Sequence, residues 1–244
     1  MQTRDPERPT LASNSSIFDE IVRVISDLGI LSRSVNQGDT VAGGATVTLV
    51  LTGTIGLFAP NKQHLAGLAG PGEVIGLEAL AGVRLPLEGR WLTPGRLLKV
   101  SAPALLSDDG DDRQLRWLAE TSAARQRALA RGVACNLGHA LIARLANLLS
   151  VLTDNGNLTS LPITQQELAQ LLGVQRTSIC AATEKLKKLG ISRVMRGQIA
   201  VRDPDRMRAM ACGCRSQEAF EGQEHSGWFA PGLRYGEDGK RAPA

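Results

Sequence analysis

Residues 161–191 read LPITQQELAQLLGVQRTSICAATEKLKKLGI, and this stretch predicts two helices joined by a tight turn. Thr164 and Glu167 form a Thr-x-x-Glu capping box, so the first helix is expected to begin at Gln165. Gly173 permits the tight turn between two crossed helices. The predicted inward side chains of the first helix are Leu168, Ala169, Leu171 and Leu172.

The second helix is predicted from Arg176 to Leu189, because Gly190 is a natural residue to end it. Its inward side chains are expected to be Ile179, Ala182, Leu186 and Leu189. Its outward side chains are expected to be Arg176, Thr177, Cys180, Ala181, Glu184 and Lys188. Short side chains in the middle of this outer face allow a helix to approach the floor of a DNA groove, and Arg176 can donate two hydrogen bonds to a guanine.

Two short strands, Ile191–Val194 and Gln198–Arg202, are predicted on either side of Arg196-Gly197. They form a two-stranded wing in which Arg196 can meet a phosphate. The whole segment is therefore predicted to be a winged helix-turn-helix. An α-hairpin that binds a protein is the structural alternative.

The distribution of charge agrees with a DNA-binding role for this segment. The 244-residue chain has a net charge of +4. Residues 161–215 contain ten basic and four acidic residues, a balance of +6, which leaves −2 for the rest. A basic segment beside a neutral-to-acidic one indicates a polyanion-binding half. A solvated charged face would give the same count.

The region 30–105 predicts a different architecture. It consists of short runs rich in Val, Leu, Ile and Thr, separated by turn signals such as Gln37-Gly38-Asp39 and Gly70-Pro71-Gly72. Such a pattern is typical of an antiparallel sandwich or barrel. Aromatic residues make up only 3% of the chain, so aliphatic side chains must build its core. A short amphipathic helix is predicted before this region, over residues 17–28, and residues 1–15 are expected to be a disordered leader.

Residues 113–153 lack proline and carry apolar residues at helical spacing. Gly132, or Asn136 as a cap, is predicted to divide the stretch into two helices. The first has one thin apolar stripe, which could pair with a second copy of itself. A linker helix that lies on the barrel is the alternative.

No signal in the sequence predicts export or a membrane span. Residues 1–16 lack the apolar run of a secretory signal. Residues 40–61 carry no charge and are long enough to span a bilayer, but their glycines, threonines and valines favour strands. Four cysteines are too few for an extracellular disulfide framework. The protein is expected to be cytoplasmic.

The stretch Leu161–Ala211, with Leu168-Ala169 ahead of Leu171-Leu172-Gly173, resembles the Crp/Fnr family of bacterial transcription regulators. Weaker matches to that family follow in the correct order at Gln37-Gly38-Asp39, Leu51–Ile55 and Pro71–Gly76, so the resemblance covers roughly residues 17–215. It implies an α+β fold with a cyclic-nucleotide-type β-roll (a jelly roll), a long dimerisation helix and a C-terminal winged helix-turn-helix. The domains expected are a leader (1–15), the roll (16–110), the dimerisation helix (111–134), the DNA-binding domain (135–215) and a disordered tail (216–244).

The resemblance further implies a homodimer whose recognition helices enter successive major grooves of a pseudo-palindromic DNA site. Thr164 and Gln165 would approach phosphate, and Arg176 takes the place of the family's guanine-reading arginine. Thr177 replaces a glutamate and Ala181 replaces a second arginine, so the target is expected to differ from that of the cyclic-AMP receptor protein. RNA polymerase is a further partner that the resemblance suggests. The predicted DNA-binding residues are Thr164, Gln165, Arg176, Thr177, Ser178, Cys180, Ala181, Lys188 and Arg196.

The nucleotide pocket of the family is degenerate in this sequence. In the family, a Gly-Glu pair binds the ribose, but in this sequence Leu77 follows Gly76. An Arg-Ser pair of the family binds the phosphate, but this chain reads LPLEG at the corresponding residues 85–89. Glu78 and Arg90 are out of register. A cyclic phosphate without a cationic partner is strongly disfavoured, so cyclic-AMP dependence is not expected. The alternative is control by an unknown small molecule in the remodelled roll.

The sequence predicts neither a cofactor nor an enzyme. An iron–sulfur cluster of the Fnr type needs N-terminal cysteines, but none precedes Cys135, and His64 alone does not support haem. Cys212-x-Cys214 supplies two metal ligands without a neighbouring histidine, so no metal is expected. No hydrolase, zinc-protease, P-loop or dinucleotide motif is present in the sequence.

A redox control at Cys180 is a separate hypothesis. This residue is expected on the DNA face near the N-terminus of the recognition helix, where a thiolate is favoured. Oxidation there would place bulk and negative charge against DNA. The alternative is a small residue merely tolerated in the groove. By analogy with the FixK branch of the family, the roll is expected to be structural, and the regulator is expected to be active without a small effector or to be controlled by its abundance.

Overall fold

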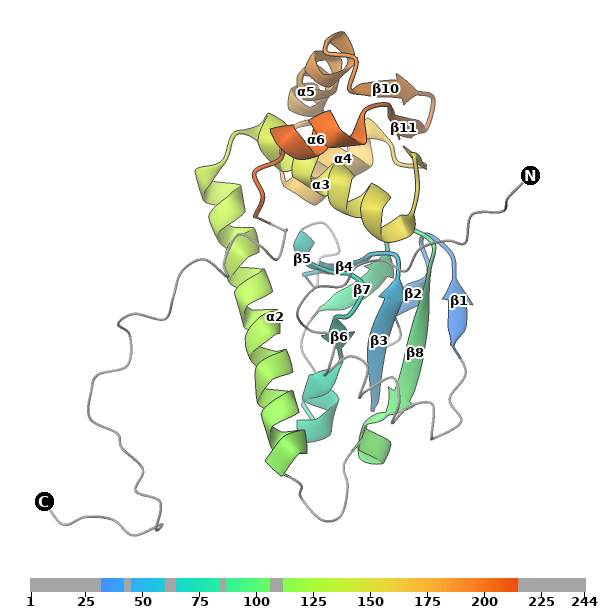
Figure 1. Cartoon of the computed structure of the whole chain (residues 1–244), viewed down its shortest axis with the longest axis vertical. Coiled ribbons are helices and arrows are strands. Elements are labelled where there is room, and N and C mark those ends of the chain that lie inside the picture. Colours follow the sequence, from blue (N-terminus) through green and yellow to red (C-terminus); the bar gives the residue numbers. More distant parts are fainter. Residues whose placement is uncertain (1–31, 42–44, 60–64, 84–86, 106–111, 215–244) are drawn as a thin grey trace, which may run out of the picture.

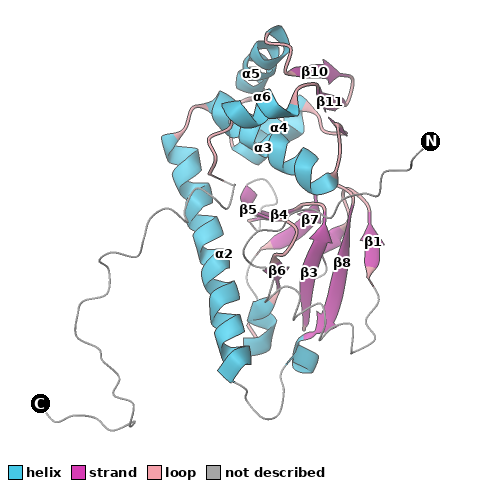
Figure 2. Cartoon of the chain, in the orientation of Figure 1, coloured by secondary structure: helices cyan, strands magenta, loops and turns pink. Residues whose placement is uncertain are grey.

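The computed structural model describes residues 32–41, 45–59, 65–83, 87–105 and 112–214 of the chain (Figure 1). The predicted leader, the predicted helix over residues 17–28, His64 and the predicted tail lie outside these residues. Figure 2 separates a strand-rich part from a helix-rich part, joined by one long helix. This is the α+β architecture that the sequence predicts.

The strand-rich part consists of two four-stranded sheets with antiparallel pairing throughout the described strands. One sheet has the order β1-β8-β3-β6 and the other β2-β7-β4-β5. The strands are β1 (Arg33–Val35), β2 (Thr40–Val41), β3 (Thr46–Thr52), β4 (Ile55–Phe58), β5 (Leu65–Ala69), β6 (Val74–Ile75), β7 (Glu88–Trp91) and β8 (Gly95–Ser101). Two short 3-10 helices complete this part, η1 (Leu77–Ala81) and η2 (Ala102–Leu105).

The uncharged stretch at residues 40–61 contributes to β2, β3 and β4. Valine and threonine favour the extended conformation here because their branched side chains pack well on a pleated surface. Within the described parts of the chain, no helix is both long and apolar enough to cross a membrane.

Trp91 occupies the centre of one apolar cluster in the roll and is only 1% exposed. Its ring fits because Gly95 has no side chain: a Cβ at that position would lie 2.5 Å from Trp91 Cζ3. Val50, Ile55 and Leu97 belong to the same cluster. The interior of the roll is therefore packed by apolar side chains at this point.

Helix α2 (Asp112–Gly138) runs along one side of the roll and contacts β5 (Figure 1). It is continuous through Gly132 and Asn136, so the prediction that either residue divides the helical stretch is wrong. A single glycine costs a helix only about 1 kcal/mol, which packing can offset. The helix ends at Gly138, and only His139 and Ala140 separate it from α3.

The helix-rich part contains α3 (Leu141–Gly156), α4 (Gln165–Leu172), α5 (Arg176–Lys188) and α6 (Pro204–Met210). A three-stranded sheet with the order β10-β11-β9 lies beside them, formed by β9 (Ser160–Leu161), β10 (Ser192–Met195) and β11 (Gln198–Val201). A shared apolar cluster fills the space between these elements. The cluster also includes Phe58 and Leu92 of the roll, so the two parts pack against each other.

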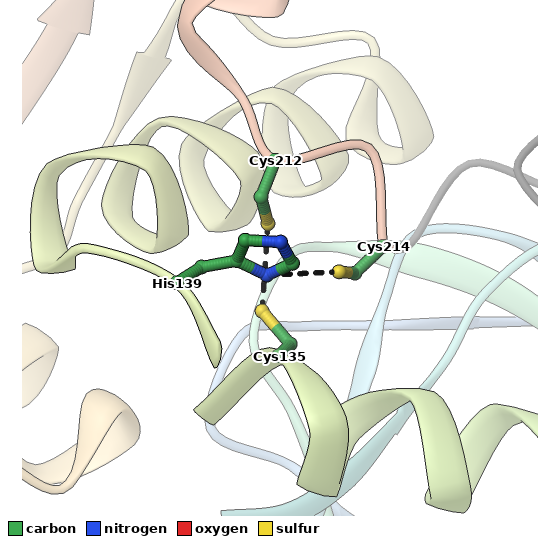
Figure 3. A group of neighbouring side chains, drawn as sticks. All are labelled: Cys135, His139, Cys212 and Cys214. Atoms are coloured by element: carbon green, nitrogen blue, oxygen red, sulfur yellow. Dashed lines mark hydrogen bonds between the residues drawn. The ribbon is translucent and has the colours of Figure 1, made fainter. Parts of the chain in front are cut away.

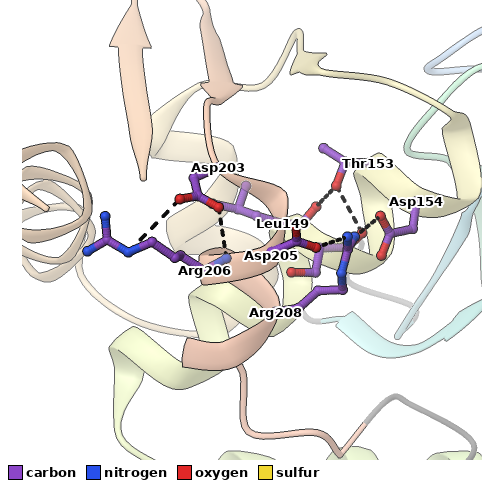
Figure 4. Close-up of polar contacts among 8 residues, drawn as sticks. Leu149, Thr153, Asp154, Asp203, Asp205, Arg206 and Arg208 are labelled. Carbon is purple, nitrogen blue, oxygen red and sulfur yellow. Dashed lines mark hydrogen bonds and ion pairs between the residues drawn. The ribbon is translucent and has the colours of Figure 1, made fainter. Parts of the chain in front are cut away.

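Polar contacts attach α6 to its neighbours (Figure 4). Arg208 donates hydrogen bonds to Asp154 at 2.9 Å and to Asp205 at 2.8 Å, and both carboxylates raise the pKa of its guanidinium. Arg206 donates from its side chain to the carbonyl of Leu189 at 3.0 Å. Helix α6 is thereby joined to the last turn of α3 and to the end of α5.

Candidate DNA-binding surface and effector domain

The first helix of the helix-turn-helix begins as the sequence predicts. Thr164 accepts a hydrogen bond from the backbone N–H of Glu167 at 3.1 Å, and Glu167 accepts one from the backbone N–H of Thr164 at 2.8 Å. This reciprocal pair is the predicted capping box. Both side chains are exposed, so the N-terminus of α4 is open to a ligand.

The second helix matches its predicted start and differs by one residue at its end. Ile179, Ala182 and Leu186 are buried as predicted. Leu189 is 39% exposed, so its predicted inward position is wrong. It lies after the last helical residue, where it no longer follows the buried face. Gly190 adopts the left-handed conformation expected of a residue that ends a helix.

The outer face of α5 carries the predicted DNA-binding side chains. Arg176, Thr177, Ala181 and Lys188 are exposed, whereas Ser178 and Cys180 are half-buried. The Cys180 thiol donates to Gln165 Oε1 at 3.3 Å. Gln165 also donates to Thr183 Oγ1 at 2.7 Å, so its side chain joins the N-terminus of α4 to α5.

The wing lies next to this face. Strands β10 and β11 pair from Ser192 with Val201 to Met195 with Gln198, close to the predicted boundaries. A hollow of about 400 Å³ lies between the start of α4, the start of α5 and the wing. Arg176 and Arg196 both line it, which brings together two cations that are twenty residues apart in sequence. Strand β9, which pairs with β11, is too short to have carried a sequence signal.

The family-type nucleotide pocket lacks its recognition groups in the described part of the roll. Leu77 opens η1 directly after Gly76, in the place where a ribose-binding carboxylate would be needed. Arg90 is exposed on β7, and its guanidinium lies 4.7 Å from the ring centre of Phe58. Of residues 85–89, where the family's Arg-Ser pair is expected, Leu85 and Pro86 lie outside the described residues.

A charged group that sequence reasoning missed enters the roll from α2. Arg125 donates to the carbonyl of Leu68 at 2.7 Å, and its guanidinium lies 3.7 Å from Glu73 Oε1. Burial lowers the pKa of Arg125, while Glu73 and Glu78 oppose that effect. Its Nη2 atom is buried and has no hydrogen-bond partner among the described residues. Helical periodicity alone could not distinguish this arginine from its solvated neighbours.

Three of the four cysteines lie together in the structure, which the sequence analysis did not predict. Cys212 and Cys214 lie beside Cys135 and His139, which are one helical turn apart near the end of α2 (Figure 3). The expectation that Cys212-x-Cys214 has no neighbouring histidine is therefore wrong. Burial raises the pKa of the Cys135 thiol to about 12, and the adjacent Cys212 and Cys214 contribute to that increase. We refer to Cys135, His139, Cys212 and Cys214 as the thiol–imidazole cluster.

Comparison with known proteins supports the DNA-binding assignment. A family model for the Crp-like helix-turn-helix domain matches residues 143–210. No sequence among the curated proteins matches this chain.

The whole fold is similar to solved structures of transcription regulators. FixK2 from Bradyrhizobium japonicum superposes with a TM-score of 0.57 and 18% identity, over 75% of this chain and 97% of that one. A CRP/FNR-family transcriptional regulator from Thermus thermophilus superposes with a TM-score of 0.59 and 23% identity, over 74% of this chain and 98% of that one. The chain thus carries a Crp-like helix-turn-helix domain within the fold of the Crp/Fnr transcription regulators, the family that its sequence resembles.

Proposed function

We propose that this protein is a homodimeric, sequence-specific DNA-binding regulator of transcription that acts without cyclic AMP. The observation that carries the proposal is the outer face of α5, where Arg176, Thr177, Ala181 and Lys188 are exposed beside a wing that bears Arg196. Small side chains in the middle of this face permit a close approach to base edges, and the cations at its margins suit phosphate or guanine.

The roles of the individual side chains follow from their positions. Arg176, in the first turn of α5, is the candidate for two hydrogen bonds to a guanine. Arg196, in the turn of the wing, is the candidate for a phosphate contact. Thr164 and Gln165 are candidates for further phosphate contacts, because they lie at the positive end of the α4 dipole. Ser178 and Cys180 complete the surface that would face DNA.

Dimerisation is supported by an apolar face on α2. Val133 and Leu137 are 59% and 85% exposed, one helical turn apart, and Ala130 continues the same stripe. Arg125 lies on a different face of the helix, directed at the roll. A second copy of α2 would bury this stripe in a parallel helix pair. The predicted division into a roll (16–110), a dimerisation helix (111–134) and a DNA-binding domain (135–215) belongs to the same proposal, with the end of the dimerisation helix moved to Gly138, where α2 ends.

Independence of cyclic AMP is supported by the side chains of the described roll. Leu77 offers no acceptor for a ribose hydroxyl, and Arg90 is exposed on the ring of Phe58. The buried Trp91 fills space between the strands. Nothing in this set complements a cyclic phosphate, whose burial would need a cationic partner.

One observation favours a second candidate, a regulator gated by another small molecule. The buried Nη2 of Arg125 lacks a partner among the described residues, which is an unfavourable state for a guanidinium nitrogen. An anionic effector that accepted a hydrogen bond from this atom would compete with Glu73 for the guanidinium. The chemistry of Arg125 therefore suits a carboxylate or phosphate compound, and Leu77, which offers no acceptor for a ribose hydroxyl, counts against cyclic AMP as that compound.

The proposal is tested by selection from random duplex DNA with reduced, purified protein and no added effector. We expect enrichment of an inverted repeat with half-sites about one helical turn apart, the spacing for a symmetric dimer. Arg176→Ala should lose this enrichment. Arg33→Ala is the matched control, because it removes the same charge from an exposed position on β1 of the roll.

No enrichment from folded wild-type protein would contradict effector independence and favour the gated alternative. A selected site without inverted symmetry would contradict the dimer. We further propose that the protein acts in the cytoplasm, where its DNA target would be accessible. Contact with RNA polymerase is part of the same proposal, and transcription from the selected site in a purified system would test it.

A further inference from the structure

The thiol–imidazole cluster joins two segments that are far apart in the sequence. Cys135 and His139 occupy the last turn of α2 and the residue that follows it, and Cys212 and Cys214 follow α6. The sulfur atoms of Cys135 and Cys212 are 3.4 Å apart, and the sulfur of Cys214 lies 3.2 Å from Nδ1 of His139 (Figure 3). All four candidate ligand atoms lie within 4.8 Å of one another.

These separations fit four ligands of a single ion. A tetrahedral zinc ion holds its sulfur ligands at about 2.3 Å and its imidazole nitrogen at about 2.0 Å, so neighbouring ligand atoms are then roughly 3.5–3.8 Å apart. The cluster needs only small rotations of its side chains to reach this arrangement. The four ligands of an iron–sulfur cluster are divided among two or more iron atoms, so the full set must stand further apart than four ligands of one ion.

A disulfide explains the positions of these four side chains less well than a bound metal ion does. None of the four cysteines of the chain is in a disulfide in the structure. A bond between Cys135 and Cys212 requires the sulfurs to approach to about 2.05 Å. A disulfide between Cys135 and Cys212 would also not explain why the sulfur of Cys214 lies so close to His139. Three thiols and an imidazole directed at one point match the ligand set of a closed structural zinc site.

We propose that Cys135, His139, Cys212 and Cys214 bind one zinc ion through three thiolates and the Nδ1 atom of the imidazole. Four protein ligands complete a tetrahedron, so the site has no open position for a substrate. Soft thiolate ligands in tetrahedral geometry favour zinc over magnesium, calcium or manganese. Binding requires neutral imidazole and three deprotonated thiols, so protons are released to solvent as the ion enters.

The location of the site gives the ion a mechanical role. Along the chain, His139 and Ala140 alone separate helix α2 from helix α3, and one side-chain hydrogen bond, from Arg144 to Oδ1 of Asn136 at 2.8 Å, crosses this link. The segment after α6 belongs to the DNA-binding domain, because α6 packs on α3 and Arg208 bonds to Asp154. An ion held by α2 on one side and by this segment on the other would restrain rotation about the link. Zinc would therefore set the orientation of α5 relative to the dimerisation helix.

The first measurement is the metal content of the full-length wild-type chain, purified under reducing conditions and freed of weakly bound metal. We expect one zinc ion per chain by elemental mass spectrometry. Substitution by Co²⁺ should produce the visible bands of tetrahedral cobalt together with strong thiolate-to-cobalt absorption. A chain that takes up no stoichiometric zinc after incubation with Zn²⁺ and reductant would overturn the proposal. Iron with inorganic sulfide in stoichiometric amounts would do so as well.

Variants identify the ligands. Cys214→Ser and His139→Ala should lose zinc, whereas His139→Cys should keep it because a fourth thiolate is also a zinc ligand. Cys180→Ser is the matched control: it removes a cysteine outside the cluster and should keep one zinc ion per chain. His139 is exposed and Cys214 is half-buried, so their variants are expected to fold, and native circular dichroism checks this. Retention of zinc by Cys214→Ser and His139→Ala would refute the assigned ligands.

The orienting role rests on the proposed DNA-binding function and is measured separately from zinc content. Removal of zinc by a chelator should weaken binding to the selected DNA site by about tenfold or more, and added Zn²⁺ should restore it. If the chain binds zinc but its DNA affinity does not change when the zinc is removed, the metal site is established and the orienting role is overturned. Bound zinc in a chain that selects no DNA sequence would instead count against the proposed function.

Discussion

The outer face of α5 and the interior of the roll use their polar side chains in opposite ways. On α5, exposed Arg176, Thr177 and Lys188 are available to a partner. At the roll, Arg125 of α2 is already engaged by Glu73 and by the carbonyl of Leu68. The candidate DNA-reading surface therefore leaves its polar side chains open to a partner, whereas the polar side chain at the roll is held by contacts within the chain. Variants on each side test this contrast.

The largest expected effect is on the core of the roll. Trp91→Ala should lower the free energy of unfolding by about 3–5 kcal/mol, because it leaves a cavity where a large, fully buried ring was packed. Urea unfolding measures the change. Val83→Ala, at a position that is 56% exposed, is the control and should change stability by less than about 0.5 kcal/mol. Equal effects of the two variants would contradict a closely packed roll.

The next effect is on DNA affinity. Arg176→Ala should weaken binding by about 1–3 kcal/mol for each half-site, which is roughly five- to 150-fold in Kd for a duplex with one half-site and the square of that factor for the symmetric site, and it should relax the preference at one base pair of each half-site. Fluorescence anisotropy with the selected duplex and single-base variants measures both. Arg33→Ala should leave affinity within about twofold. A uniform loss over all sequences would assign Arg176 to phosphate rather than to a base.

Oxidation should affect the α5 face and not the roll. Peroxide should abolish DNA binding by the wild-type chain, because an oxidised Cys180 adds bulk and negative charge against DNA. Cys180→Ser should bind DNA normally and resist peroxide at a dose that leaves the zinc content of the chain unchanged, as judged by electrophoretic mobility shift. Loss of binding by Cys180→Ser at that dose would refute the hypothesis.

A smaller effect is expected at the cap of α4. Thr164→Ala removes the oxygen that accepts from the backbone N–H of Glu167 and should cost about 1 kcal/mol of stability. Thr164→Ser keeps that oxygen and should restore most of the loss. Thermal unfolding compares the two variants. An unchanged melting temperature in Thr164→Ala would show that the cap contributes little to the native state.

The smallest expected effect is that of added cyclic AMP, and it tests the contrast between the roll and the outer face of α5 most directly. Cyclic AMP should change neither the melting temperature nor the DNA affinity, whereas a ligand present at 100 times its Kd would stabilise the protein by about 2.7 kcal/mol. Differential scanning fluorimetry provides the measurement. Stabilisation by cyclic AMP that Arg125→Met removes would contradict our account of the roll and assign Arg125 to nucleotide binding.

Sequence was most informative where the signals are local. The capping box of Thr164 and Glu167, the turn at Gly173 and the end of α5 at Gly190 each depend on residues within a few positions of one another. Backbone geometry over such distances is decided by the local side chains, so the helix-turn-helix could be placed to within a residue or two. The same reasoning failed at Gly132, because packing of α2 along the roll outweighs the modest helix penalty of one glycine.

Contacts between distant residues could be found only in the folded chain. Arg125 meets Glu73 from another element, and Cys135 meets Cys212 across 77 positions. No spacing rule reports such pairs, because their proximity depends on how whole elements pack. The amino-acid sequence was enough to find the resemblance to the Crp/Fnr family, to predict the winged helix-turn-helix and to note the departures from the family pattern at residues 76–77 and 85–89. The fold alone brought Cys135 and His139 to Cys212 and Cys214, since a metal-ligand set is a property of positions in space.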